Sequence, residues 1–343
     1  MQNITYYIGA GASFGKRDDV NNFIILEGLP IVSEIPSRMK EFRETLNKME
    51  IDETTFYLFN NINYSGNDIK TMKVQMLKDW NQLYYDIIKH ATIDTYAKKL
   101  FLTKQKHAYN KLKNLLCAYL LWEQLMNKCD QRYDTFLANI LSDVLRLPNN
   151  INVISWNYDS QFEIAYRAYS NKGSFSIFDK NGKTDLDMLG PGGYVFKVNG
   201  SATYSDTSFL DDIKSNESLS IIMQILLYYS SVEADTSQLG FHYSPHISFA
   251  WEKNNKNENM MLAMSRKIED TDVLVVIGYS FPFFNREVDR EIFKHMPKLH
   301  KIYIQDINPK VVESSIRAVL EPTDRIDIEC IYDCSNFYLP REM

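Results

Sequence analysis

The sequence predicts an α/β protein with a mostly parallel sheet and a large helical insertion. Two observations predict it. Short apolar runs each end in Gly, Asn, Asp or Ser, and the stretch from about Pro36 to Leu147 is poor in Gly and Pro and has helical spacing. We therefore expect residues 1–36 and 148–343 to form the sheet domain, and residues 37–147 to form the helical insertion.

The expected strands follow one pattern along the chain. In order, the runs are ITYYI before GAGAS, INVIS before WNYD, YVFKV before NGSA, DVLVVI before GYS, and KIYIQ before DINP. Continuous apolar runs of this length are typical of buried parallel strands. Ligands of such open sheets bind outside the carboxyl ends of the strands, so the polar residues after each run are the first candidates for a site.

Within the insertion, KLKNLLCAYLLWEQLMNKC has apolar residues at three- and four-residue steps. They are Leu112, Leu115, Leu116, Tyr119, Leu120 and Leu125. One apolar helical face of this kind indicates core packing or an oligomer contact. The polar stretch NNINYSGND, residues 60–68, is expected to be an exposed loop between helices.

Composition excludes several function classes. The chain has 343 residues, 45% of them hydrophobic, and a formal net charge of −6, which argues against a dominant nucleic-acid surface. No apolar run is long enough to span a bilayer and no signal segment begins the chain, so a cytoplasmic protein is expected. The four cysteines form no CxxC pair, which favours thiols without a metal.

Five short motifs, each at the end of an expected strand, occur in a familiar order. They are GAGAS at Gly9–Ser13, NYD at Asn157–Asp159, KVNGS at Lys197–Ser201, GYSF at Gly278–Phe281 and DINP at Asp306–Pro309. Together they resemble the sirtuin-like NAD-binding family, in the form found in bacterial antiphage-defence effectors. The resemblance implies a Rossmann-like sheet that binds NAD. The cysteine-paired zinc ribbon of the protein-deacylating members has no counterpart here.

The resemblance implies a role for each motif. The pyrophosphate loop would be Gly9, Ala10, Gly11, Ala12 and Ser13, and the second phosphate and ribose loop would be Gly278, Tyr279 and Ser280. Asp306 and Asn308 would meet the adenosine ribose, and the backbone of Cys334 would contact adenine. Asn157 matches the catalytic asparagine, and Asp159 matches the residue that holds the nicotinamide amide.

Some of these residues also have ordinary structural interpretations. Gly9 and Gly11 could serve only a tight turn. Asn157 could cap the helix expected at SQFEIAY, and Asp306 could be a turn residue.

The sequence departs from the family at one catalytic position. Asn199 stands where the family has its catalytic histidine, and an asparagine cannot take the proton that deacylation requires. Hydrolysis of NAD does not require this proton transfer, because nicotinamide is a cationic leaving group that departs as a neutral molecule. Asn199 therefore remains a catalytic candidate. His242 or His246 could replace the base, while a metal site on these two histidines is disfavoured by Pro245 between them.

The resemblance therefore implies an NAD glycohydrolase that forms nicotinamide and ADP-ribose as a toxic defence effector. An NAD- or ADP-ribose-binding module without turnover is the alternative, and a structural subunit is a third. NAD is the expected substrate, with no metal. A homo-oligomer or a co-encoded partner is expected, of the nucleotide-pyrophosphatase, DNA-translocase or Argonaute-like kind.

Overall fold

The computed structural model describes residues 2–18, 20, 24–31, 33–90, 92–142, 146–169, 177–179, 192–204, 209–234, 243–249, 251–252, 255–321 and 325–343. The chain divides into two compact units. The sheet unit comprises Met1–Leu29, Lys128–Ser201 and Ser248–Met343. The helical unit comprises Pro30–Asn127 and Ala202–Ile247.

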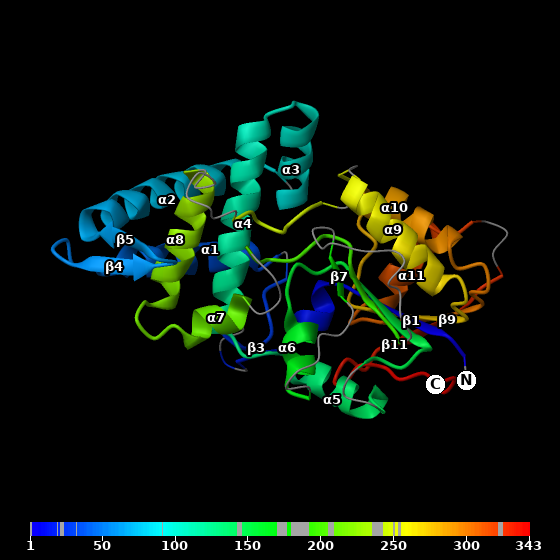
Figure 1. Cartoon of the computed structure of the whole chain (residues 1–343). Coiled ribbons are helices and arrows are strands. Elements are labelled where there is room, and N and C mark those ends of the chain that lie inside the picture. Colours follow the sequence, from blue (N-terminus) through cyan, green and yellow to red (C-terminus); the bar gives the residue numbers. More distant parts are fainter. Residues whose placement is uncertain are drawn as a thin grey trace. The chain divides into compact units, whose positions relative to one another are not determined.

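A seven-stranded sheet forms the centre of the sheet unit (Figure 1). Its strands are β1 (Ile4–Ile8), β6 (Ile151–Ser155), β7 (Ile177–Asp179), β8 (Val195–Lys197), β9 (Val273–Ile277), β10 (Lys301–Gln305) and β11 (Asp327–Ile331). The order is β11-β10-β9-β1-β6-β8-β7, and every neighbouring pair is parallel. The predicted α/β class with a parallel, Rossmann-like sheet is confirmed.

Helices cover both faces of this sheet, because successive strand residues point to opposite sides. On one face, Tyr6 of β1 packs with apolar residues of α5 (Gln131–Ile140) and α6 (Gln161–Arg167). On the other, Tyr7 packs with α9 (Asn255–Ile268), α10 (Arg286–Lys294) and α11 (Pro309–Arg317). Since both faces are buried, β1 and β9 are apolar along nearly their whole length, and the two polar residues of β6, Asn152 and Ser155, are buried as well.

Among its described residues, the sheet unit also contains short elements. They are the 3-10 helices η1 (Ala10–Ser13) and η4 (Phe283–Asn285) and the antiparallel pair β2 (Lys16–Arg17) and β3 (Ile25–Glu27).

The helical unit is built from helices and one hairpin. Its elements are α1 (Ile35–Lys48), β4 (Phe56–Phe59), β5 (Ile62–Ser65), α2 (Gly66–Ile87), α3 (Ile93–Leu102), α4 (Lys106–Met126), α7 (Phe209–Ser215) and α8 (Ile221–Glu233). Phe42, Trp80, Tyr119 and Trp122 form an aromatic cluster that joins α1, α2 and α4. Arg38 of α1 forms a bidentate ion pair with the fully buried Glu123 of α4. Each of these two charged groups in the interior therefore has a partner of opposite charge, without which its burial would be strongly unfavourable.

The division of the chain differs from the predicted one. Residues 202–247, expected in the sheet domain, belong to the helical unit through α7 and α8. In contrast, α5 was expected within the insertion, but its Tyr133, Phe136 and Leu137 pack on the sheet. Helical periodicity identifies a helix and its apolar face, but it does not say which apolar surface that face covers.

Two smaller expectations need correction. The stretch 60–68 is not a loop between helices: Asn60 and Asn61 have positive φ and connect β4 to β5, and Ser65 caps α2. Asn tolerates this conformation, which two-residue hairpin turns require. The Leu112–Leu125 face lies inside the helical unit, with Leu112, Leu115 and Tyr119 almost fully buried. These residues are therefore part of the core of the helical unit.

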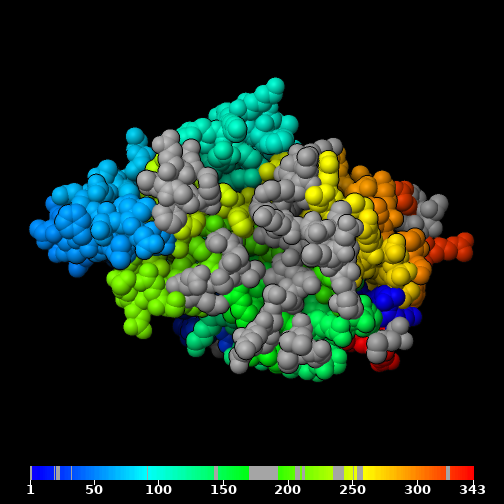
Figure 2. All heavy atoms as spheres, viewed as in Figure 1, coloured from blue at the N-terminus to red at the C-terminus, as the bar shows by residue number. Residues whose placement is uncertain are grey.

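The hairpin, by contrast, lies at the surface, within the blue area at the left of Figure 2. Its Phe56 and Leu58 side chains are exposed. Among the helices of the described residues, none combines the length and the hydropathy needed to cross a membrane.

Candidate functional site

The register of the sheet brings the predicted motifs to one edge. Ile8 of β1 pairs with Ser155 of β6 and with Ile277 of β9, so the loops after these three strands leave at the same level. Gln305 of β10 pairs with Ile277 and with Ile331 of β11, and Ser155 pairs with Lys197 of β8. All the predicted motifs thus begin along the carboxyl edge of the sheet, at the ends of neighbouring strands.

The glycine loops after β1 and β9 fit against each other with no space for side chains. A Cβ on Gly9 would lie 2.7 Å from Gly278 O, and one on Gly278 would lie 2.4 Å from Gly11 Cα. Gly278 also has φ of 59°, which disfavours other residues. This close packing already accounts for the glycines. In addition, the amides of Gly9, Gly11 and Ala12 donate to Ile277 O, Gly278 O and Gly9 O, so in this conformation they are not free for a phosphate.

Asn157 is buried behind the first glycine loop. Its Nδ2 donates to Gly9 O at 2.9 Å and to Ser13 Oγ at 3.1 Å, and Ser13 Oγ also bonds to Tyr133 OH at 2.9 Å. Asn157 therefore does not cap the following helix, whose N-cap is Ser160. Both amide hydrogens are used, so Oδ1 is the atom that remains to accept a hydrogen bond from a ligand or water.

Asp159 lies in a buried charged group that sequence reasoning missed. Its Oδ1 accepts from Gln161 N at 3.0 Å, and its backbone oxygen accepts from Lys197 Nζ. Lys197, at the end of β8, is 1% exposed and lies 3.2 Å from Glu163 Oε1. Burial raises the pKa of Glu163, while the Lys197 ammonium opposes that rise. The lysine thus fixes the loop after β6, and the glutamate compensates its charge.

Asn199 is also buried at this edge. Its Nδ2 donates to Trp156 O at 2.9 Å, and its backbone oxygen accepts from Ser248 N at 2.9 Å. The amide has no titratable proton near neutrality, so Asn199 can orient a group but cannot act as a base.

The loops after β9, β10 and β11 are more open. Ser280 and Asn308 are exposed, and Asp306 and Cys334 are partly exposed. Asp306 Oδ1 accepts from Asn308 N at 2.8 Å, so Asp306 does serve as a turn residue. The carbonyl of Cys334 accepts from Arg132 Nη1 at 3.1 Å.

Tyr279 lies differently from its neighbours. Its ring is buried and stacks on Trp156 with centroids 5.0 Å apart, and its hydroxyl donates to Asp289 Oδ2 at 3.2 Å. Only its backbone is therefore placed to meet a ligand. Tyr7 OH also donates to Asp289, at 2.5 Å, and burial raises the pKa of this carboxyl to about 8.

The histidines predicted as possible substitute bases are His242 and His246. His242 lies outside the described residues. His246 belongs to the helical unit, where its backbone N–H donates to Thr203 O at 2.9 Å.

The missed residues share one property. All four are charged residues: Lys197 is the last residue of β8, and Glu163, Asp289 and Arg132 lie on helices that cover the sheet. In the sequence, Lys197 alone gives a signal, because a lysine that directly follows a buried strand is unusual unless it has a partner. Some of their partners are distant in sequence, as Glu163 is from Lys197 and Tyr7 is from Asp289, whereas Asp130 is two residues from Arg132.

The arrangement gathers buried, fixed amide and carboxylate groups beside a tightly packed glycine loop. Such groups can orient a water and stabilise a cationic transition state without rearranging during the reaction. Within the described residues, no group of three or more His, Cys, Asp or Glu could hold a metal ion. No model of a known protein family and no curated protein matches this chain.

Proposed function

We propose that this chain hydrolyses NAD to nicotinamide and ADP-ribose at the carboxyl edge of the sheet. The observation that carries the proposal is the convergence of Asn157, Asp159 and Asn199. All three are less than 10% exposed and lie on loops of the adjacent strands β6 and β8, next to the loop after β1.

In this reaction, the three residues need only orient the water and the nicotinamide and stabilise positive charge on the ribose. Water attacks C1′ of the nicotinamide ribose, the bond from C1′ to the ring nitrogen breaks, nicotinamide leaves neutral, and one proton of the water is released. Asn157 Oδ1 would accept a hydrogen bond from that water, and Asp159 would hold the nicotinamide amide. Positive charge develops on the ribose in the transition state, so a fixed carboxylate and amide dipoles stabilise it.

The exposed loops would hold the rest of the dinucleotide. Ser280 and Asn308 present polar side chains to solvent, and the backbone near Cys334 lies at the end of the neighbouring strand. In this account, the wider biological role is that of an antiphage-defence effector that depletes NAD. It would act with further copies or with a partner of the nucleotide-pyrophosphatase, DNA-translocase or Argonaute-like kind.

One observation favours an alternative. Asn199 supplies no base and is already bound to Trp156 O, which suits a module that binds NAD or ADP-ribose without turnover.

The two functions differ in nicotinamide release. Purified protein incubated with NAD should release nicotinamide, and Asn199→His should increase the rate and introduce a pH dependence near neutrality. Binding of NAD without release by either protein, with candidate partners present, would favour the binding module. The absence of both binding and release would reject both functions.

A further inference from the structure

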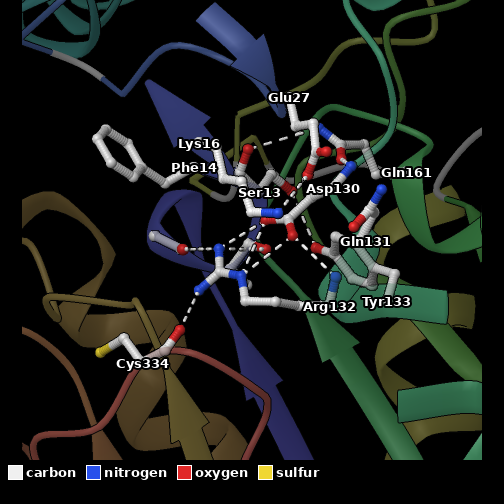
Figure 3. Close-up of polar contacts among 12 residues, drawn as sticks. Ser13, Phe14, Lys16, Glu27, Asp130, Gln131, Arg132, Tyr133, Gln161 and Cys334 are labelled. Carbon is white, nitrogen blue, oxygen red and sulfur yellow. Dashed lines mark hydrogen bonds and ion pairs between the residues drawn. The ribbon is translucent and has the colours of Figure 1, made fainter. Parts of the chain in front are cut away.

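An ion pair between the partly buried Arg132 and the buried Asp130, at the start of α5, lies beside the glycine loop (Figure 3). Asp130 is the N-cap of α5 and accepts from Arg132 N at 2.9 Å. The same carboxylate accepts from Arg132 Nε at 3.0 and 3.1 Å and from Nη2 at 2.6 Å. Asp130 is 2% exposed. The guanidinium is therefore held in one orientation by two adjacent nitrogens.

The remaining donors of Arg132 reach two loops that are far apart in the sequence. Nη2 donates to Gly11 O at 3.0 Å and to Ala12 O at 3.3 Å. Nη1 donates to Cys334 O at 3.1 Å. One side chain thus joins the loop after β1 to the loop after β11, and Figure 3 shows it between them.

The same pair is linked to a third loop. Asp130 N donates to Gln161 Oε1 at 2.7 Å, and Gln161 N donates to Asp159 Oδ1 at 3.0 Å. The orientation of Asp159 is therefore coupled to the Asp130–Arg132 pair through a single glutamine.

The geometry favours a role for Arg132 in holding the two loops together, which we call the clamp, over a role as a direct ligand of a phosphate. Carbonyl oxygens from two loops accept hydrogen bonds from one guanidinium, those of Gly11 and Ala12 from Nη2 and that of Cys334 from Nη1. Arg132 supplies donors in a planar fork, whereas lysine would supply only a compact ammonium. Asp130 compensates the charge, so the pair offers an anion little net attraction.

We propose that Arg132 is a positioning residue that holds the loops after β1 and β11 in the arrangement a ligand requires. The identity of the ligand as NAD rests on the proposed function, but the clamp itself does not. Arg132 would act through the backbone of these loops and not on the reacting atoms.

Hydrogen exchange and NAD titration test this proposal on Arg132→Lys and Arg132→Gln. Arg290→Lys is the matched control, because Arg290 also donates to a backbone oxygen, that of Ala318, but is exposed on α10. We expect backbone amides of residues 10–14 and 333–337 to exchange at least tenfold faster in both Arg132 variants and at the parent rate in the control. KM for NAD should rise about tenfold, with a smaller change in kcat.

The outcomes separate the two proposals. If both segments of either folded Arg132 variant exchange at the rate of the parent protein, the clamp is overturned, whether or not the protein binds NAD. If the parent protein neither binds nor cleaves NAD, the proposed function fails, and the exchange rates still decide the role of Arg132.

Discussion

The carboxyl edge of the sheet has a buried half and an exposed half. The buried half, the loops after β1, β6 and β8, includes Ser13, Asn157, Asp159 and Asn199, all less than 10% exposed. The exposed half, the loops after β9, β10 and β11, includes Ser280 and Asn308, which face solvent. In the buried half the chain itself supplies hydrogen-bond partners, so the polar groups are fixed before any ligand arrives. In the exposed half a ligand must replace water.

This difference assigns different roles to the two halves. Preorganised buried dipoles lower a reaction barrier because they need no reorganisation. Exposed groups exchange one hydrogen bond for another, so each contributes little to affinity. We therefore expect changes in the buried half to affect stability and turnover strongly, and changes in the exposed half to affect NAD affinity moderately.

The largest expected effect is on stability, through the buried pair Lys197–Glu163. Lys197→Met leaves the Glu163 charge without its partner and should lower the free energy of unfolding by about 3–5 kcal/mol. The double variant Lys197→Met/Glu163→Leu should recover most of this loss. Urea unfolding measures both. Lys298→Met at the exposed Lys298–Asp270 pair is the control and should change stability little. A double variant at least as unstable as the sum of its single variants would contradict the coupling.

Turnover should depend next on Asn157. Asn157→Ala removes a positioned acceptor and should reduce kcat for NAD cleavage by about a hundredfold to a thousandfold, or roughly 3–4 kcal/mol. Its effect on NAD affinity should be modest, since the exposed half is unchanged. Asn152→Ala is the matched control. Asn152 is buried within β6, the strand that precedes the Asn157 loop, away from the carboxyl end of that strand, and it donates to Lys267 O. Asn152→Ala should be less stable than the parent protein but should have the same kcat. Equal losses of kcat in Asn152→Ala and Asn157→Ala would contradict a specific role of Asn157 in turnover.

A pH-dependent effect on stability is expected from Asp289, which accepts hydrogen bonds from Tyr7 and Tyr279. Its pKa is about 8 when folded, against an ordinary value of 3.8. Between these values the folded state holds a proton that the unfolded state has lost, so this group lowers stability as pH rises, by about 1.4 kcal/mol per pH unit. Asp289→Asn should remove that slope. The free energy of unfolding, measured at several pH values, tests this prediction. If it changes with pH in the same way for the parent protein and for Asp289→Asn, the prediction is wrong.

The smallest effect is expected at Asn308 in the exposed half. It is the N-cap of α11 but makes no side-chain cap hydrogen bond, so Asn308→Ala should leave stability unchanged. Loss of one ligand hydrogen bond should weaken NAD binding by roughly 0.5–1.5 kcal/mol. Calorimetry should show this, with Asn139→Ala on the exposed surface of α5 as the control. A loss of affinity above a hundredfold would mean that the exposed half is as preorganised as the buried one.

Much of the sheet, and the meeting of the predicted motifs at one edge of it, could be predicted from sequence. Buried parallel strands leave a local signal, because β1, β6 and β9 are apolar runs that end in small or polar residues. Strand ends in a parallel sheet meet at one edge, so Asn157, Gly278 and Asp306 could be placed together without knowing any contact.

The tertiary contacts could not be predicted in this way. Whether α5 covers the sheet, or how Arg132 joins Gly11 to Cys334, depends on residues more than a hundred positions apart. The glycines show the same limit. Their spacing suggested a phosphate loop, whereas the structure shows that contact between the loops already requires Gly9 and Gly278 to lack side chains.

Calorimetric titration with NAD of the parent protein, Ser280→Trp and Ser314→Trp tests the central claim that NAD binds at this edge. Both serines are exposed, but Ser280 follows β9 at the carboxyl edge and Ser314 lies on α11. We expect the parent protein and Ser314→Trp to bind NAD equally, and Ser280→Trp, although folded, to bind NAD at least tenfold more weakly. Undiminished affinity in folded Ser280→Trp would contradict it.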